Sequence, residues 1–99
     1  MINDVLVEYD FPKGKKIVLL DRLGMENLYE KVEISRNIYL LDDQKETIWQ
    51  VSSDFDGEGN PFTNMILHHD GSITAYRWDG GNYMINTETG FATPSTIMK

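Results

Sequence analysis

The sequence predicts an all-β fold, a single-domain antiparallel β-sandwich or strongly curled sheet of about seven short strands that spans residues 1–99. Short runs of β-branched and aromatic residues alternate with turn residues at spacings near the roughly 8–12 residues typical of such folds. No helical period of useful length competes with them. Two stretches, 37–51 and 72–87, each indicate a hairpin that carries Trp and Tyr, and we expect them to nucleate the antiparallel sheet around which the chain is built.

The first third of the chain predicts two strands and a loop. Val5–Phe11 is rich in β-branched and aromatic residues and predicts the first strand, which a turn at Pro12–Gly14 closes. Ile17–Leu20 is continuously apolar and predicts a second strand with both faces buried. In Asp21–Lys31 a glycine interrupts a short run at helical spacing, so we expect a loop or a single helical turn. The alternation at Val32–Ile34 then predicts the start of the next strand.

The middle of the chain contains the first hairpin, with predicted strands at Ile38–Leu41 and Thr47–Val51. The polar and glycine-rich segment Ser52–Pro61 predicts a loop on the surface. Phe62–His68 predicts a strand. Asp70-Gly71 predicts a type I′ turn after it, in which both central residues have a positive φ.

The second hairpin has predicted strands at Ile73–Trp78 and Tyr83–Ile85. A further turn follows, and Phe91–Thr93 predicts a short strand at the edge of the sheet. We expect the tail, Ser95–Lys99, to be frayed because nothing in its sequence holds it to the sheet.

The composition limits the class of protein. Hydrophobic residues make up 40% and aromatic residues 11% of the chain, which is enough for one packed core. There is no cysteine, so disulfides and thiolate chemistry are excluded. The apolar runs are far shorter than the about 20 residues that a membrane-spanning helix needs. Met1–Asp4 lacks the basic start and apolar region of a secretion signal, so we expect a cytoplasmic protein without membrane contact.

The charge indicates the kind of partner. The formal net charge is −7 and the isoelectric point is near 4.6. Phosphate backbones repel such a surface, so we expect no direct binding to nucleic acid. Complementary charge steers association and therefore favours a basic partner. A charge that serves only solubility is the alternative.

No pattern in the chain indicates catalysis, a cofactor or a metal site. Counted from Asp54, an EF-hand pattern has its required glycine at Gly59, but Met65 stands where the ligand glutamate is required. His68 and His69 are neighbours on a strand and would point to opposite faces, so they do not share a metal ion. The sequence has neither a G-x-S-x-G elbow nor a phosphate-binding glycine loop followed by a helix. We therefore expect a protein that is not an enzyme and holds no cofactor.

Acidic residues in predicted turns and aromatic residues of the second hairpin are the candidates for partner binding. Tyr and Trp are good interface anchors, although we expect Trp49 and Trp78 in the core or over a face of the sheet. If the turns gather on one side of the fold, their carboxylates make an acidic rim beside exposed aromatic rings. The candidate residues are Asp42, Asp43, Glu46, Asp54, Asp56, Glu58, Tyr76, Asp79 and Tyr83.

Several short motifs follow one another through somewhat more than the second half of the chain. They are R-N-I-Y-x-L-D at Arg36–Asp42, T-I-W-Q-V at Thr47–Val51, N-P-F at Asn60–Phe62, D-G-S-I-T-A-Y-R-W-D-G at Asp70–Gly80 and Y-x-I-N-x-x-T-G at Tyr83–Gly90. In this order they resemble small bacterial β-proteins that act as immunity proteins in polymorphic toxin and contact-dependent growth inhibition systems. The motifs are mainly structural.

The resemblance implies an acidic, cytoplasmic and non-catalytic protein that neutralises a cognate toxin, often a nuclease, by occluding its active site or an essential surface. A basic nuclease presents a cationic cleft, which an acidic protein occupies as a polyanion mimic. Reversing Asp54 and Asp56 to lysine is then expected to slow association and leave stability nearly unchanged. The alternatives are a non-catalytic β-domain that binds a peptide, small molecule or partner subunit, and a small hydrolase with loop carboxylates.

Overall fold

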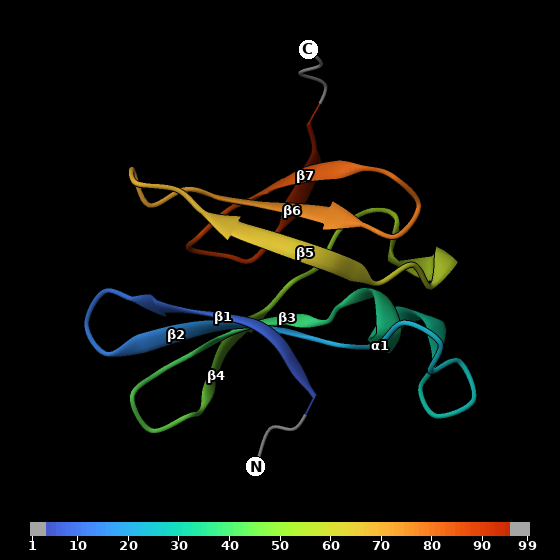
Figure 1. Cartoon of the computed structure of the whole chain (residues 1–99), viewed down its shortest axis with the longest axis horizontal. Helices are drawn as coiled ribbons and strands as arrows, with labels where there is room; N and C mark the ends of the chain where they lie inside the picture. Colours follow the sequence, from blue (N-terminus) through green and yellow to red (C-terminus); the bar gives the residue numbers. More distant parts are fainter. Residues whose placement is uncertain (1–3, 96–99) are drawn as a thin grey trace.

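The structure is a computed structural model that describes residues 4–95, and it consists of two four-stranded antiparallel sheets packed in two layers (Figure 1). Sheet 1 has the strand order β1-β2-β3-β4, and sheet 2 has the order β5-β6-β7-β8. Each strand pairs with its neighbour in the sequence, so the chain completes sheet 1 before it begins sheet 2. The predicted antiparallel all-β fold is confirmed.

The elements agree closely with the predicted runs. The strands are β1 (Val5–Phe11), β2 (Lys15–Leu20), β3 (Ile38–Leu41), β4 (Thr47–Gln50), β5 (Phe62–Leu67), β6 (Ile73–Arg77), β7 (Asn82–Ile85) and β8 (Ala92–Pro94); the helices are α1 (Lys31–Ser35) and the 3₁₀ turn η1 (Asp56–Glu58). Both predicted hairpins are present, with Leu40 opposite Trp49 in the first and Ala75 opposite Tyr83 in the second. The part of the predicted tail beyond Ser95 lies outside the described residues.

The turn between β5 and β6 differs from the prediction. The amide of Gly71 donates a hydrogen bond to the carbonyl of His68 (2.9 Å), which places His69 and Asp70 at the centre of the turn. Gly71 has φ +88°, whereas neither central residue has a positive φ. A type I′ turn needs a positive φ at both centres, so this prediction is wrong. The glycine instead follows the turn, as in three-residue hairpin loops.

Helix α1 occupies the place where the sequence predicts the start of a strand. Val32 and Ile34 alternate with polar residues in a way that suits a strand, but Ile34 and Ser35 are buried by a helical turn. The hydroxyl of Ser35 contacts the carbonyl of Lys31 (3.0 Å) and that of Asp56 (2.7 Å). This second contact joins α1 to η1, so a partner distant in the sequence stabilises a helix too short to form alone.

The core lies between the inner faces of the two sheets. Its largest cluster combines residues from both, including Ile17 and Leu40 of sheet 1 and Met65 and Ile73 of sheet 2. Trp49 is buried there as predicted, and its indole N–H donates to the carbonyl of Thr87 (2.9 Å).

Trp78, by contrast, is 58% exposed, which excludes the core and leaves a position over a face of the sheet as the other expected place. Neighbouring side chains of a strand point to opposite faces, and Arg77 takes the inward direction.

Polar contacts join the two sheets at several points. The amide of Asn37, which is 1% exposed, donates to the carbonyls of Leu20 (2.7 Å) and Phe62 (2.8 Å) and accepts from the Phe62 N–H (2.9 Å). The hydroxyl of Tyr9 donates to the carbonyl of Met65 (3.0 Å), at the outer edge of β5. A parallel bridge between residues 52 and 91 connects the end of β4 to the start of β8. The inner faces are therefore held together. On the opposite face of sheet 1, Val18, Leu20 and Leu41 form a second buried cluster, whereas the opposite face of sheet 2 has large exposed side chains.

Substituting Gly90 tests this packing. A Cβ on Gly90 would lie 2.6 Å from the indole of Trp49, and the residue has φ +80°. Because the substitution adds both backbone strain and overpacking, the Gly90→Ala variant is expected to have a free energy of unfolding about 2–4 kcal/mol lower than that of the wild type. Urea denaturation measures the difference.

The matched control is Gly24→Ala, because Gly24 has the same φ of +80° and nothing within 4 Å of its Cβ position. That variant is expected to lose only about 1 kcal/mol. Equal losses for the two variants would contradict the close contact with Trp49.

Candidate partner-binding surface

A buried ionic network lies beneath the loop that the sequence predicts as a solvated acidic segment. The carboxylate of Asp56 is 4% exposed and accepts hydrogen bonds from Arg36 Nε (2.8 Å) and Arg77 Nη2 (3.0 Å). The hydroxyl of Ser53 (2.7 Å) and its amide (2.8 Å) donate to the same carboxylate. Both carboxylate oxygens are therefore satisfied inside the protein.

The guanidinium of Arg77 is 1% exposed and completes this network from β6. It donates to the carbonyl of Ser35 (3.0 Å) and to the hydroxyl of Tyr83 (3.3 Å). Its charged carbon lies 4.2 Å from the centre of the Phe62 ring and 4.8 Å from that of Tyr83. Favourable ring faces thus replace part of the lost hydration of this cation.

These contacts show that two of the predicted partner-binding residues lie in the interior. The side chains of Asp56 and Tyr83, which are 4% exposed, hold the interior together and are not available to a partner. The prediction that Asp56 is a solvated loop carboxylate is wrong. The sequence could not separate it from Asp54 and Glu58, because its partners Arg36 and Arg77 lie about twenty residues away on either side. We therefore retain only the exposed candidates.

The other acidic candidates occupy two ends of the molecule. Asp42, Asp43 and Glu46 lie in the β3–β4 turn, and a Cβ on Gly14 would be 3.3 Å from that of Asp43, so the lysine-bearing β1–β2 turn is adjacent. At the other end, the amide of Trp78 donates to the carbonyl of Pro61 (2.8 Å). This places the β6–β7 turn with Asp79 beside the loop of Asp54 and Glu58 (Figure 1). The turns do not form one continuous acidic rim.

Exposed charge is nevertheless distributed very unevenly along the chain. Residues 46–95 contain a single lysine or arginine, Arg77, and it is buried. Their exposed carboxylates are Glu46, Asp54, Glu58, Asp70, Asp79 and Glu88. Every exposed lysine and arginine of the described residues therefore precedes residue 46, and sheet 2 with its turns presents only negative charge apart from its two histidines.

Sheet 2 also has an outer face with large uncovered side chains. Strand pairing sets Asn64, Tyr76 and Asn82 in one row across β5, β6 and β7. The next row is Ile66, Thr74, Met84 and Thr93. Ile66, Tyr76 and Met84 are 47%, 43% and 45% exposed. We call these two rows the outer face of sheet 2.

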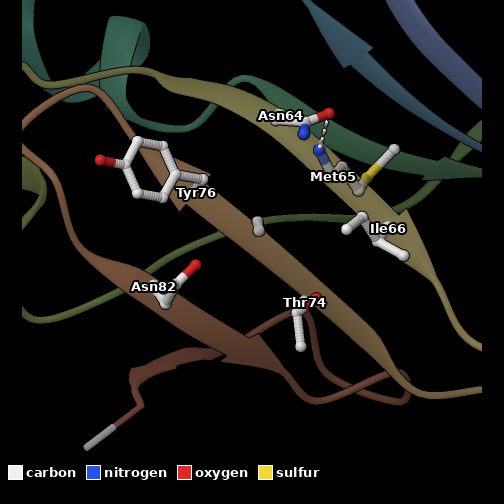
Figure 2. Close-up of a pocket in the computed structure, with 7 residues that line it drawn as sticks. Asn64, Met65, Ile66, Thr74, Tyr76 and Asn82 are labelled. Carbon is white, nitrogen blue, oxygen red and sulfur yellow. Dashed lines mark hydrogen bonds between the residues drawn. The ribbon is translucent and has the colours of Figure 1, made fainter. Parts of the chain in front are cut away.

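This face contains a hollow of about 180 Å³. Figure 2 shows the ring of Tyr76 between Asn64 and Asn82, with Ile66 and Thr74 farther along the strands. The hollow is therefore of mixed polarity, with the amides of Asn64 and Asn82 on both sides of the Tyr76 ring and the hydroxyl of Thr74 near Ile66.

Tyr76 of this group is predicted from the sequence as a binding residue, whereas Ile66, Met84 and the exposed Trp78 are not. A signal was present, since Asn64-x-Ile66 and Asn82-x-Met84 alternate with buried residues in each strand. The alternation predicts two faces. It does not say which face is covered.

The described residues contain no group of three or more His, Asp or Glu side chains that could hold a metal ion. His68 Nε2 instead contacts the hydroxyl of Thr74 (2.9 Å). Among the same residues, no helix has the length and hydropathy that a membrane span requires.

Comparison with known proteins gave no relative: no protein-family model matches the chain, and no curated protein or solved structure is significantly similar to it.

The ionic network makes a first prediction about stability. Asp56→Asn removes the negative charge that neutralises the buried Arg77, and the free energy of unfolding is expected to fall by about 3–5 kcal/mol. Asp54→Asn is the matched control, because Asp54 is exposed in the same loop, and it is expected to change by less than about 0.5 kcal/mol. Urea denaturation of both variants measures the difference. Similar values would show that the Asp56 carboxylate is not needed in the interior.

The same carboxylate makes stability depend on pH. Burial alone would raise the pKa of Asp56, but hydrogen bonds from Arg36, Ser53 and Arg77 outweigh it and lower that pKa below its ordinary value of 3.8. A carboxyl with a depressed pKa stabilises the fold above the unfolded value, and this stabilisation is lost as the pH falls through the folded value. We expect the free energy of unfolding to decrease below pH 3.8.

Hydrogen bonds from Ser72 lower the pKa of Asp70, so Asp70 also stabilises the fold less as the pH falls. Two variants separate its contribution from that of Asp56. Asp70→Asn should retain most of the decrease in acid, whereas Ser53→Ala, which removes one hydrogen bond to Asp56, should reduce it. An unchanged acid profile in Ser53→Ala would contradict the assignment to Asp56.

Proposed function

We propose that this protein binds a basic protein partner and acts as an immunity protein, neutralising a cognate toxin domain by occluding its active site or an essential surface. The observation that carries the proposal is the distribution of charge. Between residues 46 and 95 no lysine or arginine is exposed, whereas six carboxylates are. A cationic cleft that binds phosphates is complementary to such a surface.

Two further features support the proposal. The motifs quoted from the second half of the sequence resemble immunity proteins of toxin systems. The two inner faces pack on each other while the outer face of sheet 2 is uncovered, which leaves a preformed and rigid surface for a partner. In this proposal the protein inhibits by binding and carries out no chemistry of its own.

The second candidate is a non-catalytic β-domain that binds a peptide or a partner subunit. The exposed aliphatic and aromatic side chains of sheet 2 favour it equally, because they suit any protein ligand. The two candidates differ in what the partner does: a toxin arrests growth when it is expressed alone, and a subunit does not.

Co-expression tests the proposal. The tagged chain would be produced with the product of the gene immediately upstream, and complex formation and growth would be measured together. Growth arrest by that product alone, relieved by the chain in a stable complex, is the expected result. A complex without toxicity would favour the partner subunit, and toxicity without rescue would overturn the proposal for that pair.

The charge makes a kinetic prediction for the same pair. The variant Asp54→Lys with Glu58→Lys, both at exposed positions, should lower the association rate constant by about tenfold at low salt and leave the melting temperature nearly unchanged. It replaces the earlier expectation for Asp54 with Asp56, because Asp56→Lys would disrupt the buried network. Stopped-flow or surface-based kinetics at low and high salt measure the effect. An unchanged rate constant at low salt would exclude electrostatic steering by this loop.

A further inference from the structure

We propose that the outer face of sheet 2 is the docking surface, and that it receives apolar side chains of the partner that are flanked by lysine or arginine. This surface would bind the basic partner of the proposed function, so its assignment rests on that function. The expected contact moves from the acidic loops, which lie at two ends of the molecule, to the sheet between them.

The side chains of this face are of the kind that anchor interfaces. Ile66, Tyr76 and Met84 come from three adjacent strands and are each nearly half exposed. Trp78 follows Tyr76 by two residues and is 58% exposed. Aromatic residues and methionine are enriched in protein interfaces, and a few such residues carry most of the binding energy. The hollow beside the Tyr76 ring adds a recess for a side chain of the partner.

The charge around the face indicates what kind of protein covers it. Asp70 and Glu88 lie in the turns at one end of sheet 2, and Asp79 lies in the turn at the other end. No lysine or arginine is exposed between residues 62 and 95. A face that combines three large apolar or aromatic side chains with amides and hydroxyls, and has carboxylates at both ends, is complementary to apolar side chains bordered by cations.

The same charges disfavour a second copy of this chain as the occupant. A symmetric dimer through this face would bring Asp70, Asp79 and Glu88 of one copy near those of the other. Sheet 2 offers no exposed lysine or arginine to compensate them. A nucleic acid is disfavoured for the same reason, since its phosphates are repelled.

The first test uses the co-expressed upstream product. Ile66→Ser combined with Tyr76→Ala should weaken the complex by about tenfold or more in calorimetry. Ile48→Ser is the matched control, because Ile48 lies on β4 of sheet 1 and is 44% exposed, against 47% for Ile66. Glu88→Lys should weaken the complex, and Glu26→Lys, at an exposed position outside sheet 2, should weaken it less.

Full affinity of the Ile66→Ser, Tyr76→Ala double variant in a complex that still rescues growth would overturn the docking surface and leave the proposed function standing. Equal losses in the double variant and in Ile48→Ser would also overturn it. If the wild-type chain fails to bind the upstream product, the proposed function fails for that pair, and the second test decides the surface.

The second test needs no natural partner. Three synthetic peptides of equal length would be titrated into the isotopically labelled chain and followed by NMR: one with leucine and phenylalanine flanked by lysine, one with glutamate in place of lysine, and one with serine in place of the apolar residues. Only the first is expected to shift the amide signals of Asn64, Ile66, Thr74, Tyr76, Asn82 and Met84. The double variant should abolish these shifts.

Other outcomes would overturn the inference. Shifts confined to the acidic loops, or equal shifts with the serine peptide, would indicate binding by charge alone. Equal shifts with the glutamate peptide would indicate an apolar surface without charge preference. A dimer in sedimentation equilibrium that Ile66→Ser dissociates would identify a second copy as the occupant.

Discussion

The ion pair between Asp56 and Arg77 is the interaction on which the arrangement of this protein depends. It joins η1, in the connection between the sheets, to β6 in the middle of sheet 2. Ser35 at the end of α1 contacts both partners, through the Asp56 carbonyl and the Arg77 guanidinium. Burying two charges is costly unless each is paired and hydrogen-bonded. Here the Asp56 carboxylate accepts from Arg36, Ser53 and Arg77, and both terminal nitrogens of Arg77 donate, while its buried Nε lacks a partner among the described residues. These contacts favour one local geometry of the connection.

This geometry determines which face of sheet 2 is free. Because Arg77 points into the network, Tyr76 and Trp78 on either side of it must point outward. The amide of Asn37 holds the start of β5 against β2, so the inner face of sheet 2 is committed to the core. The outer face of sheet 2 is thus exposed as a consequence of the packing inside the protein. An interior constraint and a surface available for binding have the same origin.

The same fold distributes the exposed charges unequally between the two sheets. In sheet 1 the β1–β2 turn, which contains Lys13, lies beside the β3–β4 turn and its carboxylates, so the charges are mixed. In sheet 2 the one arginine is used in the interior, and the turns carry carboxylates only. Residues 51–95 therefore carry a net charge of −5, from six carboxylates and one arginine, whereas residues 4–50 carry −3, from ten carboxylates and seven lysines and arginines. Such asymmetry orients an approaching basic partner toward sheet 2.

The strands and both hairpins are predictable from the sequence, because alternation and turn residues act over a few neighbouring positions. The sequence also indicated acidic loops and Tyr76 as binding candidates. The tertiary structure decided the rest. Arg77 and Asp56 are separated by 21 residues, and Arg77 and Ser35 by 42 residues, so no local pattern could identify their contacts. These distant contacts accompany three differences from the local patterns. Val32–Ile34 is helical, Asp56 is buried and Trp78 is exposed. Local patterns predict elements and their two faces, and only packing decides which face is covered.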